Sequence, residues 1–386
     1  MTINGKIKVV HILEGFTGGT STYMSTVLPE LVQEGFDVTL IISIERCTPD
    51  TEMRLETLKK RGVSVYIIPM CRQINPYRDS RSFIAILRLL SKNDFDIVHT
   101  HCSKAGALGR FAGYLAGTKI RLHTPHCFAF TRCGGRIGKL QYLAIEKLLG
   151  KLTTKLVAVA QSEKSAAVSS KIIPGRKCIT VPNALSNGHF LRGKASQLRN
   201  SSGKISLGFN KNTKIVTTAC RLVEYKGIFR FIEAAALSRT LDTVFLIAGD
   251  GQLRHSAEKL IKEKKLSDKV KLLGHISDME RIYAVSDVVI LCSNAEAQPY
   301  ILLEAMRAKC PIVATDVPGN QDIIQHEKTG LLTEPAPDAI AGAIDSLITD
   351  TDKADQLAEN AYEYFHEHHT LETQITELSK IYRSFM

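Results

Sequence analysis

The chain has 386 residues, of which 44% are hydrophobic and 23% are charged, and its formal net charge is +11. This length exceeds one typical domain and suits two of roughly 150–200 residues, while the composition is that of a folded globular protein. No apolar run approaches the roughly 18–20 residues of a membrane-spanning helix, and no secretory signal peptide is visible, so we expect a cytoplasmic protein.

The positive charge is concentrated in the first half of the chain. Residues 1–200 carry a net +16 (29 basic against 13 acidic residues), whereas residues 201–386 carry a net −5 (21 against 26). Nucleic acid, an anionic membrane surface and a phosphorylated substrate all fit such a charge, and a charge that serves solubility alone is the plain alternative. The chain has no Trp and no recognised nucleic-acid motif, which disfavours a nucleic-acid-binding protein.

Apolar runs and helical patterns alternate along the first half. The helical patterns include Ser21–Glu34 and Phe83–Lys92. The apolar runs are almost continuous, which is typical of parallel sheets covered by helices on both faces. We predict strands at Lys6–Leu13, Phe36–Ser43, Val63–Pro69, Asp96–Cys102, Lys119–Cys127, Lys155–Ser162 and Cys178–Pro182.

A polar segment rich in Gly, Ser and Asn follows at residues 186–212, which we expect to connect two domains. The alternation then resumes, and residues 338–386 show helical patterns only. The expected fold class is α/β, with two doubly wound, Rossmann-like parallel-sheet domains at 1–185 and 213–368 that face each other across a cleft. In the second domain we predict strands at Lys214–Arg221, Thr243–Asp250, Val270–Gly274, Val288–Ser293 and Pro311–Asp316.

A glycine-rich turn follows the first predicted strand. Gly18 and Gly19 precede Thr20, Ser21 and Thr22, which are able to cap the next helix. Backbone N–H groups in such a turn can meet a phosphate or an approaching substrate, although the sequence also suits an ordinary tight turn. The pattern is neither GxGxxG nor a Walker loop, which disfavours an NAD-dependent dehydrogenase.

Cationic residues follow the first strand of the second predicted domain. Arg221 ends that strand, and Lys226 lies just before Gly227 and a helix. A guanidinium can bind a diphosphate as a fork and an ammonium as a point charge, and both would help the diphosphate to leave. Gly249 and Asp250 end the next strand, in a turn that either faces a nucleotide or is a plain one. An isolated Arg–Lys pair is more often a solvated surface.

Two glutamates flank the start of a predicted helix. Glu296 lies in the loop after the strand Val288–Ser293, and Glu304 lies in the early turns of the helix that follows Pro299. Ligands of open α/β sheets bind at the carboxyl ends of the strands, and a helix N-terminus favours a nearby carboxylate. Two carboxylates there are able to hold several sugar hydroxyls.

His126 lies at the end of a predicted strand, in a position expected to face the cleft. Its imidazole is a candidate to donate to a sugar hydroxyl or to stabilise developing charge, and a buried structural histidine is the plain alternative. The nine cysteines are scattered without a CxxC pair, and no HExxH motif or Asp-rich cluster occurs. We therefore expect neither a disulfide framework nor a metal site.

Taken in this order, the motifs resemble those of the family 4 glycosyltransferases, which are retaining enzymes with the GT-B fold. The resemblance covers nearly the whole chain and is strongest from Ala219 to Leu332, in ACRLVEYKG, AGDGQL, the glutamate pair with LLEAM, PIVATDVPG and KTGLL. It implies that residues 1–185 bind the acceptor and residues 213–368 the nucleotide sugar. It also implies a C-terminal helix in 369–386 that crosses back to the N-terminal domain.

The resemblance further implies roles for single residues. Glu296 matches the glutamate on the donor sugar, and Glu304 matches the one on the ribose. Arg221 and Lys226 match the diphosphate-binding pair, and His126 matches a histidine near the reacting sugar. The expected catalytic residues are thus His126, Arg221, Lys226 and Glu296. The donor is expected to contact Gly18, Gly19, Arg221, Lys226, Gly249, Asp250, Glu296, Tyr300, Ile301, Leu302 and Glu304.

The chain departs from the family pattern at several positions. Ala297–Tyr300 stand where the family has a glycine and an aromatic residue after the first glutamate, in the loop that cradles the donor sugar. Lys309 and Cys310 occupy the region in which the helix usually ends in glycine. Asn320 and Asp322 replace a glycine and a glutamate after the proline turn.

The implied reaction transfers a hexose or N-acetylhexosamine from a nucleotide diphosphate sugar, expected to be UDP-linked, with retention at the anomeric carbon. The expected acceptor is lipid-linked or a polysaccharide precursor of a cell-surface glycan, and no cofactor, metal or protein nucleophile is expected. Such an acceptor would place the basic N-terminal domain against anionic headgroups at the inner face of the cell membrane. Phe128, Phe130 and the basic turn up to Lys139 are the expected contact.

Two other functions fit the same fold. A nucleotide-sugar epimerase would convert its substrate with no acceptor present. A nucleotide-sugar-binding subunit would have no turnover of its own, and the altered loop Ala297–Tyr300 is the feature that favours it.

Overall fold

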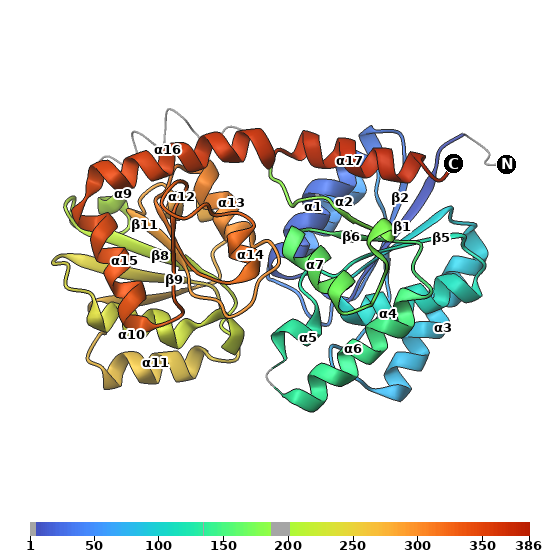
Figure 1. The fold of residues 1–386 in the computed structure, drawn as a ribbon, viewed down its shortest axis with the longest axis horizontal. Coiled ribbons are helices and arrows are strands. Elements are labelled where there is room, and N and C mark those ends of the chain that lie inside the picture. The colour runs from blue at the N-terminus through green and yellow to red at the C-terminus, as the bar shows by residue number, and fades with distance from the viewer. Residues whose placement is uncertain (1–4, 134, 187–200) are drawn as a thin grey trace. The chain divides into compact units, whose positions relative to one another are not determined.

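The computed structural model describes residues 5–133, 135–186 and 201–386. The chain divides into two compact units (Figure 1). Unit 1 comprises Met1–Asn183 together with Leu371–Met386, and unit 2 comprises Ala184–Thr370. No helix in the described ranges is both long enough and apolar enough to cross a bilayer.

Unit 1 is built on a seven-stranded sheet whose neighbouring strands are all parallel, in the order β3-β2-β1-β4-β5-β6-β7. Five of the six residues of β1 are buried, because both faces of this central strand are covered. The register places His11 of β1 opposite His99 of β4. The strands are β1 (Lys8–Leu13), β2 (Asp37–Ile42), β3 (Ser64–Ile67), β4 (Ile97–His101), β5 (Ile120–Thr124), β6 (Lys155–Ala158) and β7 (Cys178–Thr180).

The last helix of the chain belongs to unit 1, where it packs against α1. Its residues Leu378 and Tyr382 are fully buried, and the Tyr382 ring meets Phe36 edge to face at 5.5 Å. The helices of unit 1 are α1 (Gly18–Gln33), α2 (Thr51–Lys60), α3 (Pro76–Asn93), α4 (Ser103–Leu115), α5 (Ala129–Arg132), α6 (Arg136–Gly150), α7 (Gln161–Ser169), the 3₁₀ turn η1 (Gly175–Lys177) and α17 (Leu371–Arg383).

Unit 2 contains a six-stranded parallel sheet in the order β10-β9-β8-β11-β12-β13. The whole of β11 is buried, as its run of four apolar residues predicts. The strands are β8 (Lys214–Ala219), β9 (Thr243–Ala248), β10 (Val270–Gly274), β11 (Val288–Leu291), β12 (Ile312–Thr315) and β13 (Leu331–Thr333).

Helices and short helical turns connect these strands, and two long helices follow the last strand. They are α9 (Ser201–Ser206), the 3₁₀ turn η2 (Glu224–Lys226), α10 (Ile228–Leu237), α11 (Arg254–Glu263), α12 (Met279–Tyr283), α13 (Tyr300–Arg307), α14 (Pro318–Gln321), α15 (Pro337–Thr349) and α16 (Thr351–His368). The main core of unit 2 is formed where α10 and α15 pack together against the sheet.

We expected residues 186–212 to connect the two domains, but the second half of this segment departs from that prediction. Residues 187–200 lie outside the described residues, but α9 follows them and belongs to unit 2. The buried Lys204 amine of α9 donates to the Thr213 carbonyl at 2.8 Å and to the Asp287 carboxylate at 2.7 Å. These bonds anchor α9 to unit 2, so this part of the segment is not an interdomain connection.

Candidate functional site

Four turns of unit 2 meet at the carboxyl edge of its sheet. Because β9, β8, β11 and β12 are parallel neighbours, the turns that follow them lie side by side. Gly249 follows β9, Lys226 follows β8, Glu296 follows β11 and Gly319 follows β12. The predicted donor-binding residues of unit 2 therefore share one edge, at which open α/β sheets bind their ligands.

Lys226 and Glu296 form an ion pair at this edge. The Lys226 Nζ donates to Glu296 Oε1, and the two side chains are only 15% and 9% exposed. Burial is the largest single effect and lowers the pKa of Lys226, but the Glu296 carboxylate, together with Tyr225 and Cys220, more than offsets burial and holds that pKa above its ordinary value. The lysine is therefore a fixed positive charge beside a carboxylate, at a position that a diphosphate could reach.

Arg221 is held by an aromatic residue of the same turn. Its Nη2 donates to the Tyr225 hydroxyl at 2.7 Å. The backbone carbonyl of Tyr225 in turn accepts from the Asn294 backbone N–H at 2.7 Å, and Arg230 donates to the Cys292 carbonyl and to the Asn294 side chain. These bonds tie the turn after β8 to the turn after β11. Neither Tyr225 nor Arg230 was predicted from the sequence, because no motif assigns a role to either residue.

Glu304 lies in the second turn of α13 and accepts a hydrogen bond from a buried tyrosine. Tyr283 Oη donates to Glu304 Oε2 at 2.6 Å. Burial and the Glu304 charge raise the pKa of Tyr283 well above its usual value, so the hydroxyl remains a donor. Tyr283 therefore fixes the orientation of the Glu304 carboxylate, and it too was missed at the sequence level.

The first residues of α13 are placed to act through their backbones. Tyr300, Ile301 and Leu302 all have side chains that pack into the interior of unit 2. The Leu302 N–H already bonds to the Pro299 carbonyl at 3.2 Å. Because a helix N-terminus presents unpaired N–H groups, any contact of this segment with an anion would use the backbone.

Glycine is required where these turns approach each other. A Cβ on Gly227 would lie 2.0 Å from the Cys292 carbonyl oxygen, and one on Gly249 would lie 1.9 Å from the Cys220 carbonyl oxygen. Both glycines also have positive φ angles, of 69° and 129°. A Cβ on Gly319 would lie 2.4 Å from the Glu296 backbone. The glycines thus allow the close packing that positions the loop of Glu296.

The loop Ala297–Tyr300, which departs from the family pattern, is packed inward. Ala297 is 5% exposed, Gln298 6% and Tyr300 6%. The Gln298 amide lies 3.5 Å from His369 Nδ1, within unit 2. The substituted residues thus fill the interior behind Glu296. At the next turn, α14 ends at Gln321, and Asp322 is its C-cap residue.

In unit 1, the helix after the glycine-rich turn begins earlier than expected. Gly18 and Gly19 form the first turn of α1, and Thr17 occupies the N-cap position without a side-chain cap bond. Thr20 and Ser21, expected as caps, lie inside the helix and donate back to the carbonyls of Thr17 and Gly18. A hydroxyl within a helix can satisfy itself in this way, which explains the wrong prediction.

His126 follows β5 with a left-handed φ of 50°, and it is half-buried. Its Nε2 lies 3.0 Å from His101 Nδ1, and its ring meets the Tyr23 ring edge to face. Burial, with a smaller effect of the Arg132 charge, lowers the pKa of His126 to about 3. The imidazole is therefore neutral near pH 7 and is held by a buried histidine that the sequence pattern did not reveal.

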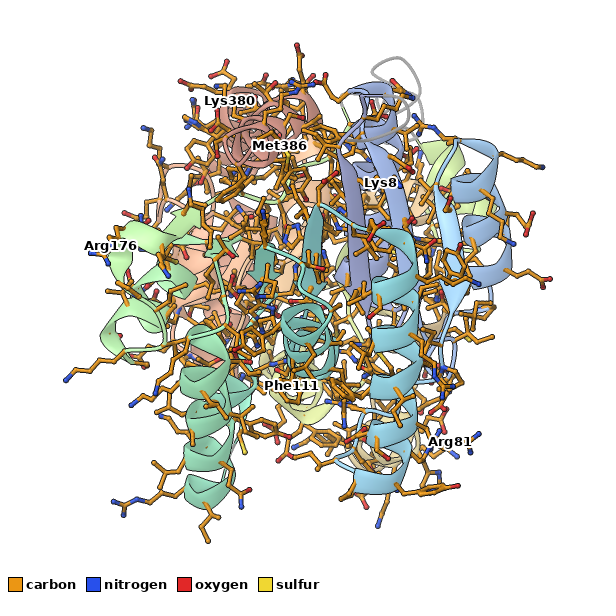
Figure 2. All side chains as sticks on the ribbon, turned by 90° about the vertical axis from the view of Figure 1, so that its right-hand side faces the viewer. Lys8, Arg81, Phe111, Arg176, Lys380 and Met386 are labelled. Carbon is orange, nitrogen blue, oxygen red and sulfur yellow. The ribbon has the colours of Figure 1, made fainter. Side chains whose placement is uncertain are left out.

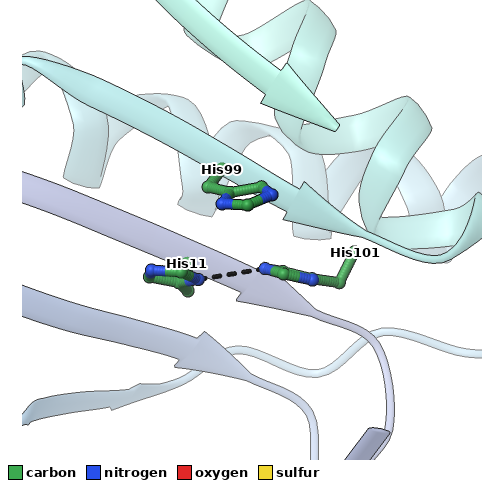
Figure 3. Close-up of side chains that lie close together, drawn as sticks. All are labelled: His11, His99 and His101. Carbon is green, nitrogen blue, oxygen red and sulfur yellow. Dashed lines mark hydrogen bonds between the residues drawn. The ribbon is translucent and has the colours of Figure 1, made fainter. Parts of the chain in front are cut away.

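His101 belongs to a buried cluster with His11 and His99, whose ligand nitrogens lie within 4.8 Å of one another (Figure 3). Such a set could hold a metal ion. Its facing nitrogens are, however, already hydrogen-bonded: His11 Nδ1 to His101 Nε2 at 3.0 Å, and both nitrogens of His99 to hydroxyl groups. A metal would have to displace these bonds.

The predicted membrane contact at Phe128 and Phe130 is not supported. These side chains are 2% and 5% exposed and stack on each other at 5.0 Å, within a core that includes Leu156 and Ile172. Two aromatic rings beside a glycine-rich turn were expected at the surface, but the short helix α5 turns both into the interior of unit 1.

Two family models together match most of the chain. The family described as Glycosyltransferase Family 4 matches residues 17–186, and the one described as Glycosyl transferases group 1 matches residues 203–364. The first covers most of unit 1, and the second covers the turns that carry Arg221, Lys226, Glu296 and Glu304.

Relatives and solved structures agree with these matches. An α-1,3-galactosyltransferase of Escherichia coli, named for UDP-Gal and GlcNAc-diphosphoundecaprenol, is 31% identical over 86% of this chain and 85% of its own. The capsular polysaccharide glycosyltransferase CapM of Staphylococcus aureus is 23% identical over 90% of this chain and 96% of its own. The crystal structure of Anabaena HepE superimposes with a TM-score of 0.83 at 18% identity, covering 98% of this chain and all of that one.

The two parallel-sheet units are accordingly the Rossmann-like domains of the GT-B fold, as predicted. The two family matches, one in each half, and the relative from E. coli place the chain in one class of enzyme. The protein belongs to the family 4 glycosyltransferases and is a glycosyltransferase.

Proposed function

We propose that the protein transfers a hexose or N-acetylhexosamine from a UDP-linked sugar to a lipid-linked acceptor or polysaccharide precursor, with retention at the anomeric carbon. The observation that carries this proposal is the buried ion pair of Lys226 and Glu296, with Arg221 in the same turn. At the carboxyl edge of a parallel sheet, two cations suit the charge of a diphosphate and one carboxylate suits the hydroxyl groups of its sugar.

The geometry suggests how these groups would act. Arg221 and Lys226 would bind the diphosphate, whose negative charge grows as the bond to the sugar breaks. Cations that are fixed before the reaction stabilise this developing charge more than they stabilise the ground state, and this difference accelerates the reaction. Glu296 would accept from sugar hydroxyls, while Glu304, oriented by Tyr283, would accept from the ribose.

The relatives support the classes of donor and acceptor. The E. coli relative is named for a UDP-sugar and a diphosphoundecaprenol acceptor, and HepE was crystallised with UDP and glucose. Two other relatives are named as glycosyltransferases of capsular polysaccharide and O-antigen biosynthesis. We assign this chain to the same kind of reaction, in the building of a cell-surface glycan.

A lipid-linked acceptor requires contact with a membrane surface, and α6 has the pattern of an interfacial helix. Ile137, Leu140 and Leu148 are 75%, 59% and 64% exposed along one stripe of this helix. On α4, which packs against α6, Phe111 and Tyr114 are 45% and 52% exposed, and Figure 2 shows Phe111 between α6 and α3. Apolar side chains flanked by cations favour an anionic bilayer surface.

The charge of α6 supports this orientation. Arg136, Lys139 and Lys147 are exposed on the helix, and its acidic residue, Glu146, is buried in an ion pair with Arg110. The exposed charges of α6 are thus all basic. We propose that the exposed surface of α6 holds unit 1 at the inner face of the cell membrane, beside the lipid-linked acceptor.

A thermal-shift screen with a panel of nucleotide sugars tests the donor. A UDP-sugar at 100 times its dissociation constant should stabilise the protein by about 2.7 kcal/mol. Lys226→Ala should lose most of that shift, whereas Lys259→Ala, at a residue 72% exposed on α11, should keep it. The absence of any shift with every nucleotide sugar would contradict the proposal. Conversion of the donor without an acceptor would point to an epimerase instead.

Sedimentation with liposomes tests the membrane surface. The protein should bind vesicles rich in anionic lipid at low salt and dissociate as salt screens the charges. The triple variant Ile137→Gln, Leu140→Gln and Leu148→Gln should bind much less. Leu241→Gln, at a leucine 87% exposed on unit 2, serves as the matched control. Equal binding by the triple variant and the wild type would exclude α6 as the contact.

A further inference from the structure

A continuous chain of hydrogen bonds runs through the interior of unit 1 and ends at His126. From the far end, Thr124 Oγ1 lies 2.9 Å from His99 Nε2, and His99 Nδ1 lies 2.6 Å from Tyr382 Oη. Tyr382 Oη is 3.4 Å from His11 Nε2. Figure 3 shows the next link, from His11 Nδ1 to His101 Nε2 at 3.0 Å. The last link joins His101 Nδ1 to His126 Nε2 at 3.0 Å.

The sheet register explains why these side chains meet. Parallel pairing sets His11 opposite His99, and His101 opposite Thr124. Because side chains alternate along a strand, His99 and His101 lie on the same face of the sheet, and the pairing puts His11 and Thr124 on that face too. Tyr382 of α17 reaches the same face. The five residues before His126 are less than 1% exposed.

The histidine rings in this hydrogen-bonded chain are neutral. Burial lowers the pKa of His11 to about 3, and burial with the neighbouring rings lowers the pKa values of His99 and His101 well below the usual range. A neutral imidazole has one donor and one acceptor nitrogen. The proton position on each ring therefore fixes the proton position on the next.

If each group in this hydrogen-bonded chain donates to the next one, the donation can run in either of two directions. If it runs from His126 towards Thr124, then His99 Nε2 donates to the Thr124 hydroxyl. Within the described part of the chain, Thr124 Oγ1 bonds only to His99, so its own proton would be left buried without an acceptor. If it runs from Thr124 towards His126, the Thr124 hydroxyl donates, and among the described residues the one N–H of the hydrogen-bonded chain without a protein acceptor is that of His126 Nδ1, on a ring that is only half-buried. Leaving a buried donor unpaired costs free energy, so the second direction is favoured.

We propose that this hydrogen-bonded chain is directional, starting at the Thr124 hydroxyl, and that it holds His126 as the tautomer with its proton on Nδ1. In the described residues, His126 Nδ1 makes no hydrogen bond to the protein. The chain thus presents a neutral N–H donor at this nitrogen. Under the proposed function, on which this last step rests, the donor serves an oxygen of a bound substrate. Thr124 and Tyr382 are then positioning residues.

Nitrogen-15 NMR of the full-length protein, labelled in its histidine rings, tests the direction. Protonated and bare ring nitrogens have well-separated shifts, and a His126→Gln spectrum assigns the signals. We expect a protonated Nδ1 and a bare Nε2 on His126. Thr124→Val removes the starting donor and should give a mixture of tautomers at His126, whereas Thr124→Ser should restore the wild-type pattern.

Two tyrosine variants provide the second test. Tyr382→Phe breaks the middle of the chain and should also give mixed tautomers at His126. Tyr23→Phe removes a hydroxyl from a ring that packs on both His101 and His126 but forms no link of the chain, so it should change nothing. A protonated Nε2 in the wild type would overturn the proposal. So would an unchanged Nδ1 tautomer in both Thr124→Val and Tyr382→Phe.

The same variants give a kinetic readout once a donor and an acceptor are found. If both tautomers bind the donor equally and only one supports transfer, equal populations should lower kcat about twofold and leave KM for the donor unchanged. Because the NMR result needs no substrate, it decides the direction of the chain even if the proposed reaction is wrong. Absence of transfer with every donor would overturn the reaction alone.

Discussion

Lys226 and Glu296 each stabilise the other's charge in the absence of a donor. Their side chains are too buried for water to replace a lost partner fully. Arrival of a diphosphate would give Lys226 a second anion and allow Glu296 to turn towards hydroxyl groups. The charges of the pair are thus already largely desolvated, which is the condition under which fixed charges act most strongly on a bound group.

Lys226→Ala should lower kcat by roughly 10²–10³-fold, the range seen when one group that stabilises developing charge is removed. Lys226→Arg keeps the charge but changes its shape, and it should retain part of the activity. Initial rates at saturating acceptor measure the effect, and circular dichroism checks that the fold survives. Near wild-type turnover of Lys226→Ala would show that the residue is not at the reacting centre.

For individual residues, the sequence predicted the positions of the charged groups far better than it predicted the residues that hold those groups in place. Arg221, Lys226 and Glu296 follow strands, so strand prediction alone brings them to one edge. Tyr283 precedes Glu304 by 21 positions and meets it only through tertiary packing. The histidine links of unit 1 depend on strand order and register, which a single sequence does not reveal.

At the scale of elements, a buried ion pair joins α4 to α6. Arg110 Nη2 donates to Glu146 Oε2 at 2.8 Å, and its Nε donates to the Gly106 carbonyl at 2.7 Å. The Arg110 side chain is 0% exposed and that of Glu146 is 5% exposed. The pair thus fixes the two helices that carry the proposed membrane surface.

Arg110→Met should lower the free energy of unfolding by about 3–5 kcal/mol, because it leaves the Glu146 charge buried without its partner. The double variant Arg110→Met and Glu146→Leu should recover much of that loss, since no charge then remains buried. Urea denaturation followed by circular dichroism measures both. Equal destabilisation by the single and the double variant would show that packing, and not charge, dominates here.

The strands were the most predictable elements. All twelve predicted strands are present, because uninterrupted apolar runs are a strong signal for buried parallel strands. β13 (Leu331–Thr333) was missed, because Leu331 and Leu332 are two apolar residues in an otherwise polar stretch, which is too short a run to indicate a strand. Helix starts were less predictable: α1 begins at Gly18 without a capping side chain, although three good caps follow it.

On the scale of the whole molecule, the buried neutral histidines make the free energy of unfolding depend on pH. The folded pKa of His11, about 3, is far below the ordinary value of 6.5 that it regains on unfolding. The unfolded chain therefore binds more protons between these values, and stability is lost as pH falls below about 6.5. Each such histidine contributes about 1.4 kcal/mol per pH unit within this window.

His11→Asn should reduce this slope by about the contribution of one histidine, whatever it does to stability at pH 7. Urea titrations at several pH values between 7 and 5 give the slope for both proteins. Identical slopes would mean that His11 is protonated in the folded state, and the neutral hydrogen-bonded cluster would then be wrong.

The position of α17 also determines the order in which the molecule can be completed during translation. Unit 2 is one continuous stretch, Ala184–Thr370, whereas unit 1 needs Leu371–Met386, which are synthesised after unit 2. At 5–20 residues per second, about 10–40 s separate the release of the first part of unit 1 from that of its final helix. Until Tyr382 arrives, His99 and His11 of β4 and β1 lack the hydroxyl group that bonds them. The domain that is made first is therefore the one that finishes folding last.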